Sequence, residues 1–184
     1  MACNRYICLV VNNTGPGGQA APAGLEPVRA LLNSWLIPND SRRPTDNFAA
    51  FAAERRWGPG DAARVRELRD DLRHVVESGD PGPLNEWIWR TGIRPEVAGG
   101  VIAYRHDAGP AGDFLAAVLS AVGAGTWKRL KACPDCRWVF YDNTRNGGKR
   151  WCLMYAGGPD GRACGTIAKV RRYRDRQAEA AGRP

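Results

Sequence analysis

The chain of 184 residues contains six cysteines, and four of them follow one another within its last third. Cys133 and Cys136 are separated by two residues, a spacing that lets a tight turn direct both sulfurs at one ion. Cys152 and Cys164 are the other cysteines of this half of the chain. Four thiolates without a redox-tuned partner suit a closed, tetrahedral site for a structural Zn²⁺ ion. The sequence therefore predicts one zinc ion, whose binding supplies much of the folding free energy of this region, about 10 kcal/mol in peptide models.

The C-x2-C pair has a second interpretation, because redox proteins carry the same spacing where a strand opens into a helix. Here Pro134 and Asp135 lie between the cysteines, and an aromatic-rich run follows at 138–141. That order is typical of a zinc knuckle leading into a short strand, so zinc is the favoured interpretation. Cys3 and Cys8 lie far from the pair in sequence and are expected to be buried thiols.

Sequence motifs for catalysis are missing. The chain has two histidines, His74 and His106, and neither belongs to an H-E-x-x-H motif. His106 is followed by Asp-Ala, so the H-x-E pattern of the nucleobase deaminases also fails. The glycines at 15–18 do not have the spacing of a dinucleotide-binding or Walker loop. A site with four cysteine ligands leaves no open position for a substrate, so an enzyme is not the favoured class.

The net charge of +8 is distributed unevenly along the chain. Residues 1–125 contain thirteen Lys and Arg against fourteen Asp and Glu, whereas residues 126–184 contain fourteen against five. All of the excess positive charge therefore lies around the cysteines and in the tail behind them. Such an asymmetry indicates an anionic partner, most often nucleic acid. A solvated basic tail that serves only solubility is the alternative.

The basic residues form two clusters, one in a loop before the third cysteine of the predicted site and one in an expected helix after the fourth. On a helix Lys169, Arg172 and Arg176 share one face, and Val170 and Tyr173 are expected to pack against the zinc module. A helix that is basic around most of its circumference suits a nucleic-acid groove, with guanidinium groups on phosphates and base edges. The residues predicted to contact nucleic acid are Arg145, Lys149, Arg150, Lys169, Arg171, Arg172, Arg174 and Arg176.

The rest of the chain predicts a mainly α fold with a few short strands. Expected strands lie at 6–11, 99–104 and 138–141, and expected helices at 25–36, 46–57, 61–79, 84–90 and 114–122. Residues 1–126 are expected to form a mainly helical domain and residues 127–184 a small zinc-binding module with a basic C-terminal helix. The sequence has no apolar run of about 18 residues and no secretory signal, so a cytoplasmic protein without membrane contact is expected.

The cysteine-rich segment resembles the CGNR zinc finger family over about residues 130–176. The resemblance is carried by Cys133-x2-Cys136, Phe-Tyr-Asp at 140–142, Lys-Arg-Trp-Cys at 149–152, Cys164-Gly165 and the basic run at 169–174. Two features depart from the family pattern. Thr166-Ile167 replaces the signature Asn-Arg, and residues 156–163 form an insertion before the last cysteine. The Gly- and Pro-rich insertion is compatible with the zinc site because lengthening a loop costs little entropy.

The resemblance implies a zinc-containing, DNA-binding transcriptional regulator. The N-terminal part resembles the mainly helical domain that precedes the finger in many family members, through residues 10–14, Trp35-Leu36 and the expected helix from Asp61. This second resemblance implies a sensor or partner module, which dimerises or binds a small-molecule effector. A different class remains open, in which the helical domain holds a ligand pocket or the pocket of a biosynthetic enzyme and the zinc is purely structural. Thr166-Ile167 in place of Asn-Arg would fit such a finger, because a purely structural finger does not need to recognise DNA bases. RNA binding is a third alternative.

Overall fold

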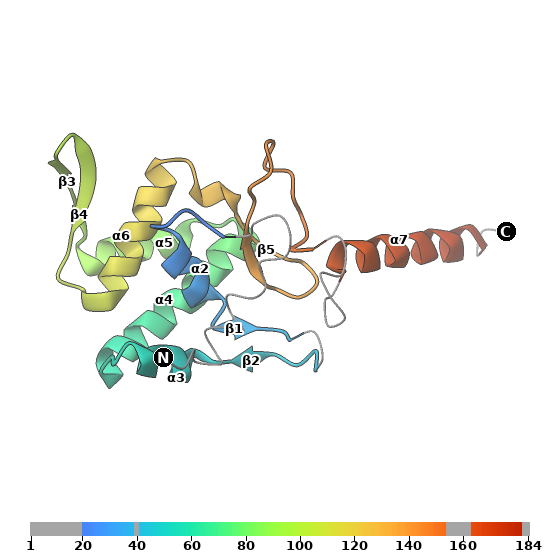
Figure 1. Ribbon diagram of the computed structural model, residues 1–184, viewed down its shortest axis with the longest axis horizontal. Helices are drawn as coiled ribbons and strands as arrows, with labels where there is room; N and C mark the ends of the chain where they lie inside the picture. Colours follow the sequence, from blue (N-terminus) through green and yellow to red (C-terminus); the bar gives the residue numbers. More distant parts are fainter. Residues whose placement is uncertain (1–19, 39–40, 154–162, 182–184) are drawn as a thin grey trace, which may run out of the picture.

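The computed structural model describes residues 20–38, 41–153 and 163–181, and these parts form a mainly helical fold with three short antiparallel strand pairs, as predicted (Figure 1). The helices are α2 (Glu26–Leu32), α3 (Phe48–Glu54), α4 (Pro59–Ser78), α5 (Gly82–Thr91), α6 (Gly109–Gly123), the 3₁₀ turn η1 (Trp127–Arg129) and α7 (Cys164–Ala181). The strands are β1 (Trp35–Leu36), β2 (Thr45–Asp46), β3 (Arg94–Ala98), β4 (Val101–Arg105), β5 (Leu130–Ala132) and β6 (Val139–Tyr141). The strand expected at 6–11 and the cysteines Cys3 and Cys8 lie outside the described residues.

Helix α4 is the centre of the helical body and packs against α2, α5, α6 and β5. Val65, Leu68, Leu72 and Val75 recur at three- and four-residue spacing and are all buried. Burying each of these side chains contributes about 1.5–3 kcal/mol, so this stripe fixes the helix against its neighbours. The helix ends where the sequence predicts, at Gly79, whose positive φ of 79° suits a residue without a side chain.

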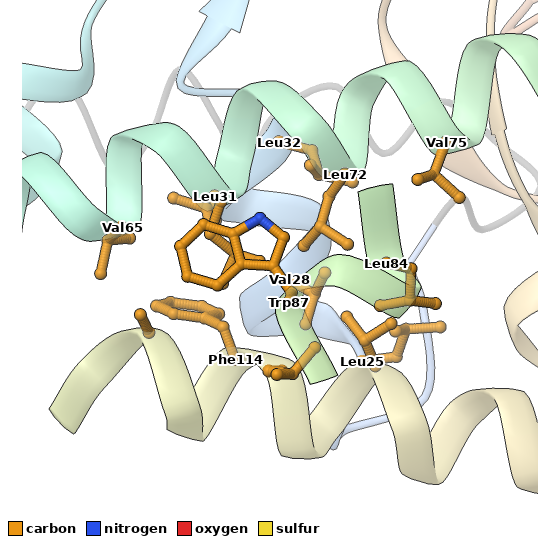
Figure 2. Close-up of a cluster of buried hydrophobic side chains, with 14 of the residues drawn as sticks. Leu25, Val28, Leu31, Leu32, Val65, Leu72, Val75, Leu84, Trp87 and Phe114 are labelled. Atoms are coloured by element: carbon orange, nitrogen blue, oxygen red, sulfur yellow. The ribbon is translucent and has the colours of Figure 1, made fainter. Parts of the chain in front are cut away.

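Trp87 of α5 fills the space between α4 and α6, among Val28, Leu31 and Leu32 of α2 and beside Phe114 (Figure 2). Its ring is 2% exposed, and its Nε1–H donates to the Asp71 carboxylate at 2.7 Å. The indole therefore contributes a large apolar surface to the core while its one polar atom is satisfied.

Helix α2 is shorter than the predicted helix 25–36, because the chain turns after Leu32. The next two residues form tertiary hydrogen bonds: the Asn33 side chain binds the backbone of Val139, and the Ser34 carbonyl accepts the N–H of Asn47 at 2.7 Å. Trp35 then lies in β1, which pairs with β2. The apolar spacing at 28–35 is compatible with a longer helix, and long-range hydrogen bonding overrides it.

The single strand expected at 99–104 is in fact half of a hairpin. Strands β3 and β4 pair around Gly99-Gly100, and both glycines have positive φ, as a two-residue hairpin turn requires. Strand β3 is not evident from the sequence because Pro95 and Glu96 are unfavourable in strands. No helix among the described residues is long and apolar enough to cross a membrane.

The C-terminal module is joined to the helical body through its β5–β6 hairpin. Leu130, Val139 and Tyr141 belong to the same buried cluster as the helices, whereas Trp138 and Phe140 point into a second cluster around the cysteines. Beyond this second cluster, α7 extends away from the rest of the molecule (Figure 1). The division of the chain at residue 126 stays a prediction.

Candidate metal centre and nucleic-acid interface

The four cysteines predicted as ligands lie together, although up to 31 positions separate them in the sequence. Their Sγ atoms all lie within 4.8 Å of one another, with 3.4 Å between Cys136 and Cys152 and 3.7 Å between Cys152 and Cys164. A tetrahedral ion with Zn–S bonds of about 2.3 Å places its sulfurs about 3.8 Å apart. All four side chains are buried. The distances, the donor type and the closure of the site fit one structural zinc ion.

The knuckle that carries the first two ligands is closed by backbone hydrogen bonds. The N–H of Cys133 donates to the Trp138 carbonyl at 2.9 Å, and the N–H of Arg137 donates to the Cys133 carbonyl at 2.8 Å. Arg137 takes a left-handed conformation with φ of 59°, which reverses the chain into β6. Cys164 is the first residue of α7, and the N–H of Gly165 binds the Leu153 carbonyl at 2.9 Å. This last bond holds the third ligand beside the fourth.

Thiols at these distances do not ionise independently. Hydrogen bonds from the other three thiols lower the pKa of Cys133, whereas hydrogen bonding to Cys133 and Cys136, together with burial, raises the pKa of Cys152 and of Cys164. A divalent cation removes this conflict because it stabilises all four thiolates at once. Metal binding therefore releases protons, and the affinity of the site for zinc decreases in acid.

Two buried side chains of the helical body fix the orientation of the zinc module. Asn33 forms two hydrogen bonds with the backbone of Val139, both at 2.8 Å. Arg73 donates to the carbonyls of Leu32 at 2.8 Å and of Arg137 at 3.1 Å, and Glu77 forms ion pairs with both arginines. Burial lowers the pKa of Arg73, and Glu77 partly offsets this effect. The knuckle is therefore attached to α2 and to the C-terminal half of α4.

The first basic cluster lies in the loop between β6 and Cys152. Arg145 and Arg150 are exposed, and Lys149 is half-buried. The Lys149 ammonium lies 5.4 Å from the centre of the Phe140 ring, and the Arg150 guanidinium lies 5.5 Å from that of Trp151. The structure thus places all three predicted residues of this cluster on the same loop, with the charged groups of Lys149 and Arg150 near aromatic rings of the finger.

The second basic cluster lies on α7. All five predicted contact residues of this helix, Lys169, Arg171, Arg172, Arg174 and Arg176, are exposed, and none of them forms an ion pair with another described residue. The predicted packing of Val170 and Tyr173 against the finger is wrong, because these side chains are 43% and 57% exposed. Packing fails because α7 leaves the finger within its first turns, so within the described parts of the chain burial on this helix is confined to its start, around Cys164–Ala168.

Two cations and one acid of this module have roles that the sequence analysis did not find. Arg129 and Lys131 lie under the loop before Cys152, where they bind backbone carbonyls, and Asp142 is fully buried beside them. Arg129 ends η1 directly before β5, and Lys131 is the middle residue of β5. No local sequence signal separates these two cations from those that face outward. Lys131 and Arg129 therefore organise the loop instead of facing a partner.

A closed four-cysteine site between a small hairpin and an exposed helix defines this part of the chain as a structural zinc-binding module. The model of the CGNR zinc finger family matches residues 129–177, a segment that contains all four cysteines and both basic clusters. This segment is a CGNR zinc finger, which confirms the resemblance drawn from the sequence. Thr166 and Ile167, in place of the signature Asn-Arg, lie in the first turn of α7. No curated protein is significantly similar to the chain.

Proposed function

We propose that the protein is a DNA-binding transcriptional regulator, in which the zinc finger presents α7 to the DNA. The observation that carries this proposal is the exposure of all five basic side chains of α7 on a helix that extends beyond the protein body (Figure 1). Basic side chains without ion-pair partners among the described residues retain their full charge for an external anion. The finger matched by the family model supports the same class of partner.

The dimensions and the charge pattern of α7 support duplex DNA as that anion. An α-helix with its side chains is about 10–12 Å wide, and the major groove of B-DNA is about 12 Å wide. Lys169, Arg172 and Arg176 lie on one face of the helix, so they can reach phosphates along one strand. Arg171 and Arg174 lie on another face and can reach the opposite groove wall or a guanine edge.

Regulation is assigned to the helical body. Residues 1–126 are proposed to act as the sensor or partner module that dimerises or binds a small-molecule effector, and residues 127–184 as the DNA-binding module. The hydrogen bonds of Asn33 and Arg73 to the knuckle offer a physical link, because a shift of α2 or α4 also moves the finger. Because thiols stay reduced in the cytosol, the four cysteine ligands also support our proposal of a cytoplasmic location.

Salt dependence of DNA binding tests the proposal. If α7 and the adjacent loop neutralise about six phosphates, the affinity for a duplex decreases about 10³-fold between 50 and 200 mM salt. Each phosphate contact contributes about 0.9 to the steepness of the plot of log K against log salt. Replacing Lys169, Arg172 and Arg176 with Gln removes three such contacts and should reduce the steepness by about 2.7.

A matched control changes the same number of charges on the helical body. Arg43, Arg64 and Arg94 are exposed and form no ion pair with another described residue. Their replacement with Gln should leave the slope unchanged. Equal loss of affinity in both triple variants would show that net charge, and not α7, governs binding. Preferential binding of single-stranded RNA over the duplex would favour the RNA-binding alternative.

A further inference from the structure

One buried carboxylate ties together the two ends of the basic loop before Cys152. Asp142 is 0% exposed and accepts four hydrogen bonds. At the start of the loop the donors are the N–H of Thr144 at 3.0 Å and its hydroxyl at 2.5 Å. At the end of the loop the donor is the N–H of Lys149 at 2.7 Å. The fourth donor is the ammonium of Lys131 on the adjacent strand β5, at 2.8 Å. Closing the loop on a single side chain limits its freedom.

Two cations beneath the loop bind its carbonyl groups. Lys131 also donates to the carbonyls of Gly147 and Lys149. Arg129 donates to the carbonyls of Asp142 at 2.9 Å, Thr144 at 2.7 Å and Arg145 at 3.4 Å. Five carbonyl oxygens are thus turned inward, onto positive charge. The negative ends of these peptide groups therefore do not face an approaching anion.

The outer surface of the same loop is positively charged. Arg145 and Arg150 are exposed, and neither forms an ion pair with another described residue. Burial raises the pKa of Asp142, but the hydrogen bonds from Lys131, Thr144 and Lys149 outweigh this effect and lower the pKa well below its ordinary value. The loop thus combines a fixed backbone, buried carbonyls and outward cations, the properties of a preformed binding element for phosphate groups.

We propose that the loop at 143–150 is a preformed phosphate-binding element of the DNA interface, separate from α7, and that Asp142 is the residue that positions it. This inference rests on the proposed function, because it names a second contact of the same finger with the phosphate backbone. Asp142 itself contacts no phosphate. It acts by holding the loop backbone that carries Arg145, Lys149 and Arg150 in one conformation before DNA arrives, so less binding energy is spent on ordering the loop.

If Asp142 positions the loop, replacing it should change the affinity for DNA in the direction opposite to that expected from net charge. Replacing Asp142 with Asn removes a negative charge, which by charge alone strengthens binding to a polyanion. If Asp142 positions the loop, Asp142→Asn weakens binding instead, by about eightfold at 0.1 M salt for each phosphate that the loop no longer neutralises. Asp175→Asn is the matched control, because Asp175 is an exposed acid on α7. This control should leave affinity unchanged or raise it slightly.

A double-mutant cycle separates positioning from general damage to the finger. Asp142→Asn is combined in turn with Gln at Arg145, Lys149 and Arg150, and with Gln at Lys169, Arg172 and Arg176. If Asp142 acts by positioning the loop, adding Asp142→Asn to the loop-charge variant causes no further loss of DNA affinity. Adding it to the α7 variant causes a loss equal to the sum of the two separate losses. Zinc content and the unfolding midpoint are measured on every variant. Should Asp142→Asn fail to fold, Thr144→Val removes one donor without changing charge and should weaken binding to a smaller extent.

The outcomes are distinguishable from failure of the proposed function. If the wild-type protein shows no salt-dependent binding to duplex DNA, the proposed function is wrong. If the wild type binds but zinc-loaded Asp142→Asn binds as well as or better than it, only the role of Asp142 is overturned. Additivity between Asp142→Asn and the loop-charge variant would likewise overturn it, because independent sites add.

Discussion

The attachment of the zinc finger to the helical body depends on Asn33, a residue 106 positions away from its partner. Its side-chain carbonyl accepts the N–H of Val139 and its amide donates to the carbonyl of Val139, both at 2.8 Å. Both residues are 0% exposed. Asn33→Ala leaves two buried backbone groups without partners, at about 1–3 kcal/mol each. The expected loss is therefore about 2–6 kcal/mol, a large part of the 5–15 kcal/mol that is typical of a folded domain.

Urea denaturation of the zinc-loaded protein, followed by circular dichroism, measures this loss. We expect the midpoint to decrease in Asn33→Ala with an unchanged slope, because the surface exposed on unfolding stays the same. Asn47→Ala is the matched control, since Asn47 precedes α3 without a side-chain capping bond. It should cost less than about 0.5 kcal/mol. An Asn33→Ala variant as stable as this control would refute the account of how the finger is attached.

Three further predictions concern the metal site, the link to α4 and the acid stability of the body. Cys133→Ser should abolish binding of the single zinc ion, which metal analysis of the purified protein detects as a fall from one equivalent per chain to none. Arg73→Met should destabilise the protein by about 2–3 kcal/mol in urea melts, because it removes charged hydrogen bonds to the carbonyls of Leu32 and Arg137. The hydrogen bond from Arg69 lowers the pKa of Asp46 below its ordinary value of 3.8. The ion pair therefore stabilises the native state fully above pH 3.8, and this stabilisation is lost as the pH decreases through the lowered pKa of the native state. Asp46→Asn should accordingly be less stable than the wild type at neutral pH, by about 1 kcal/mol or less because Asp46 is 38% exposed, and melts at pH 7 and pH 3 should show the difference shrinking in acid.

The zinc site could be predicted from the sequence because its chemistry is carried by residue type. The spacing of Cys133 and Cys136, together with the aromatic run that follows them, favours a zinc knuckle, and Cys152 and Cys164 were the other cysteines of this half available to complete a tetrahedral site. Helix α4 could be predicted for a similar reason, since its apolar stripe and Gly79 are local signals. Features of this kind need no knowledge of distant parts of the chain.

Features that depend on distant partners could not be predicted in this way. The end of α2 is set by the bonds of Asn33 to Val139, and no local pattern indicates a partner in another part of the chain. In the sequence, Arg129 and Lys131 are basic residues of the same basic region as the outward-facing arginines of α7. In the structure, however, they bind backbone carbonyls of the loop before Cys152. Charge alone does not distinguish a cation that organises the protein from one that contacts a partner.

We infer that one zinc ion, held by cysteines 133, 136, 152 and 164, organises both basic segments into a single cationic surface. The decisive measurement is the affinity of the protein for duplex DNA with and without zinc. Fluorescence anisotropy at 100 mM salt should show binding by the zinc-loaded protein, disappearance of that binding after chelation and recovery when zinc is restored. Equal affinity of the chelated and the zinc-loaded protein would contradict the claim, because binding would then need the charges but not the fold that zinc imposes.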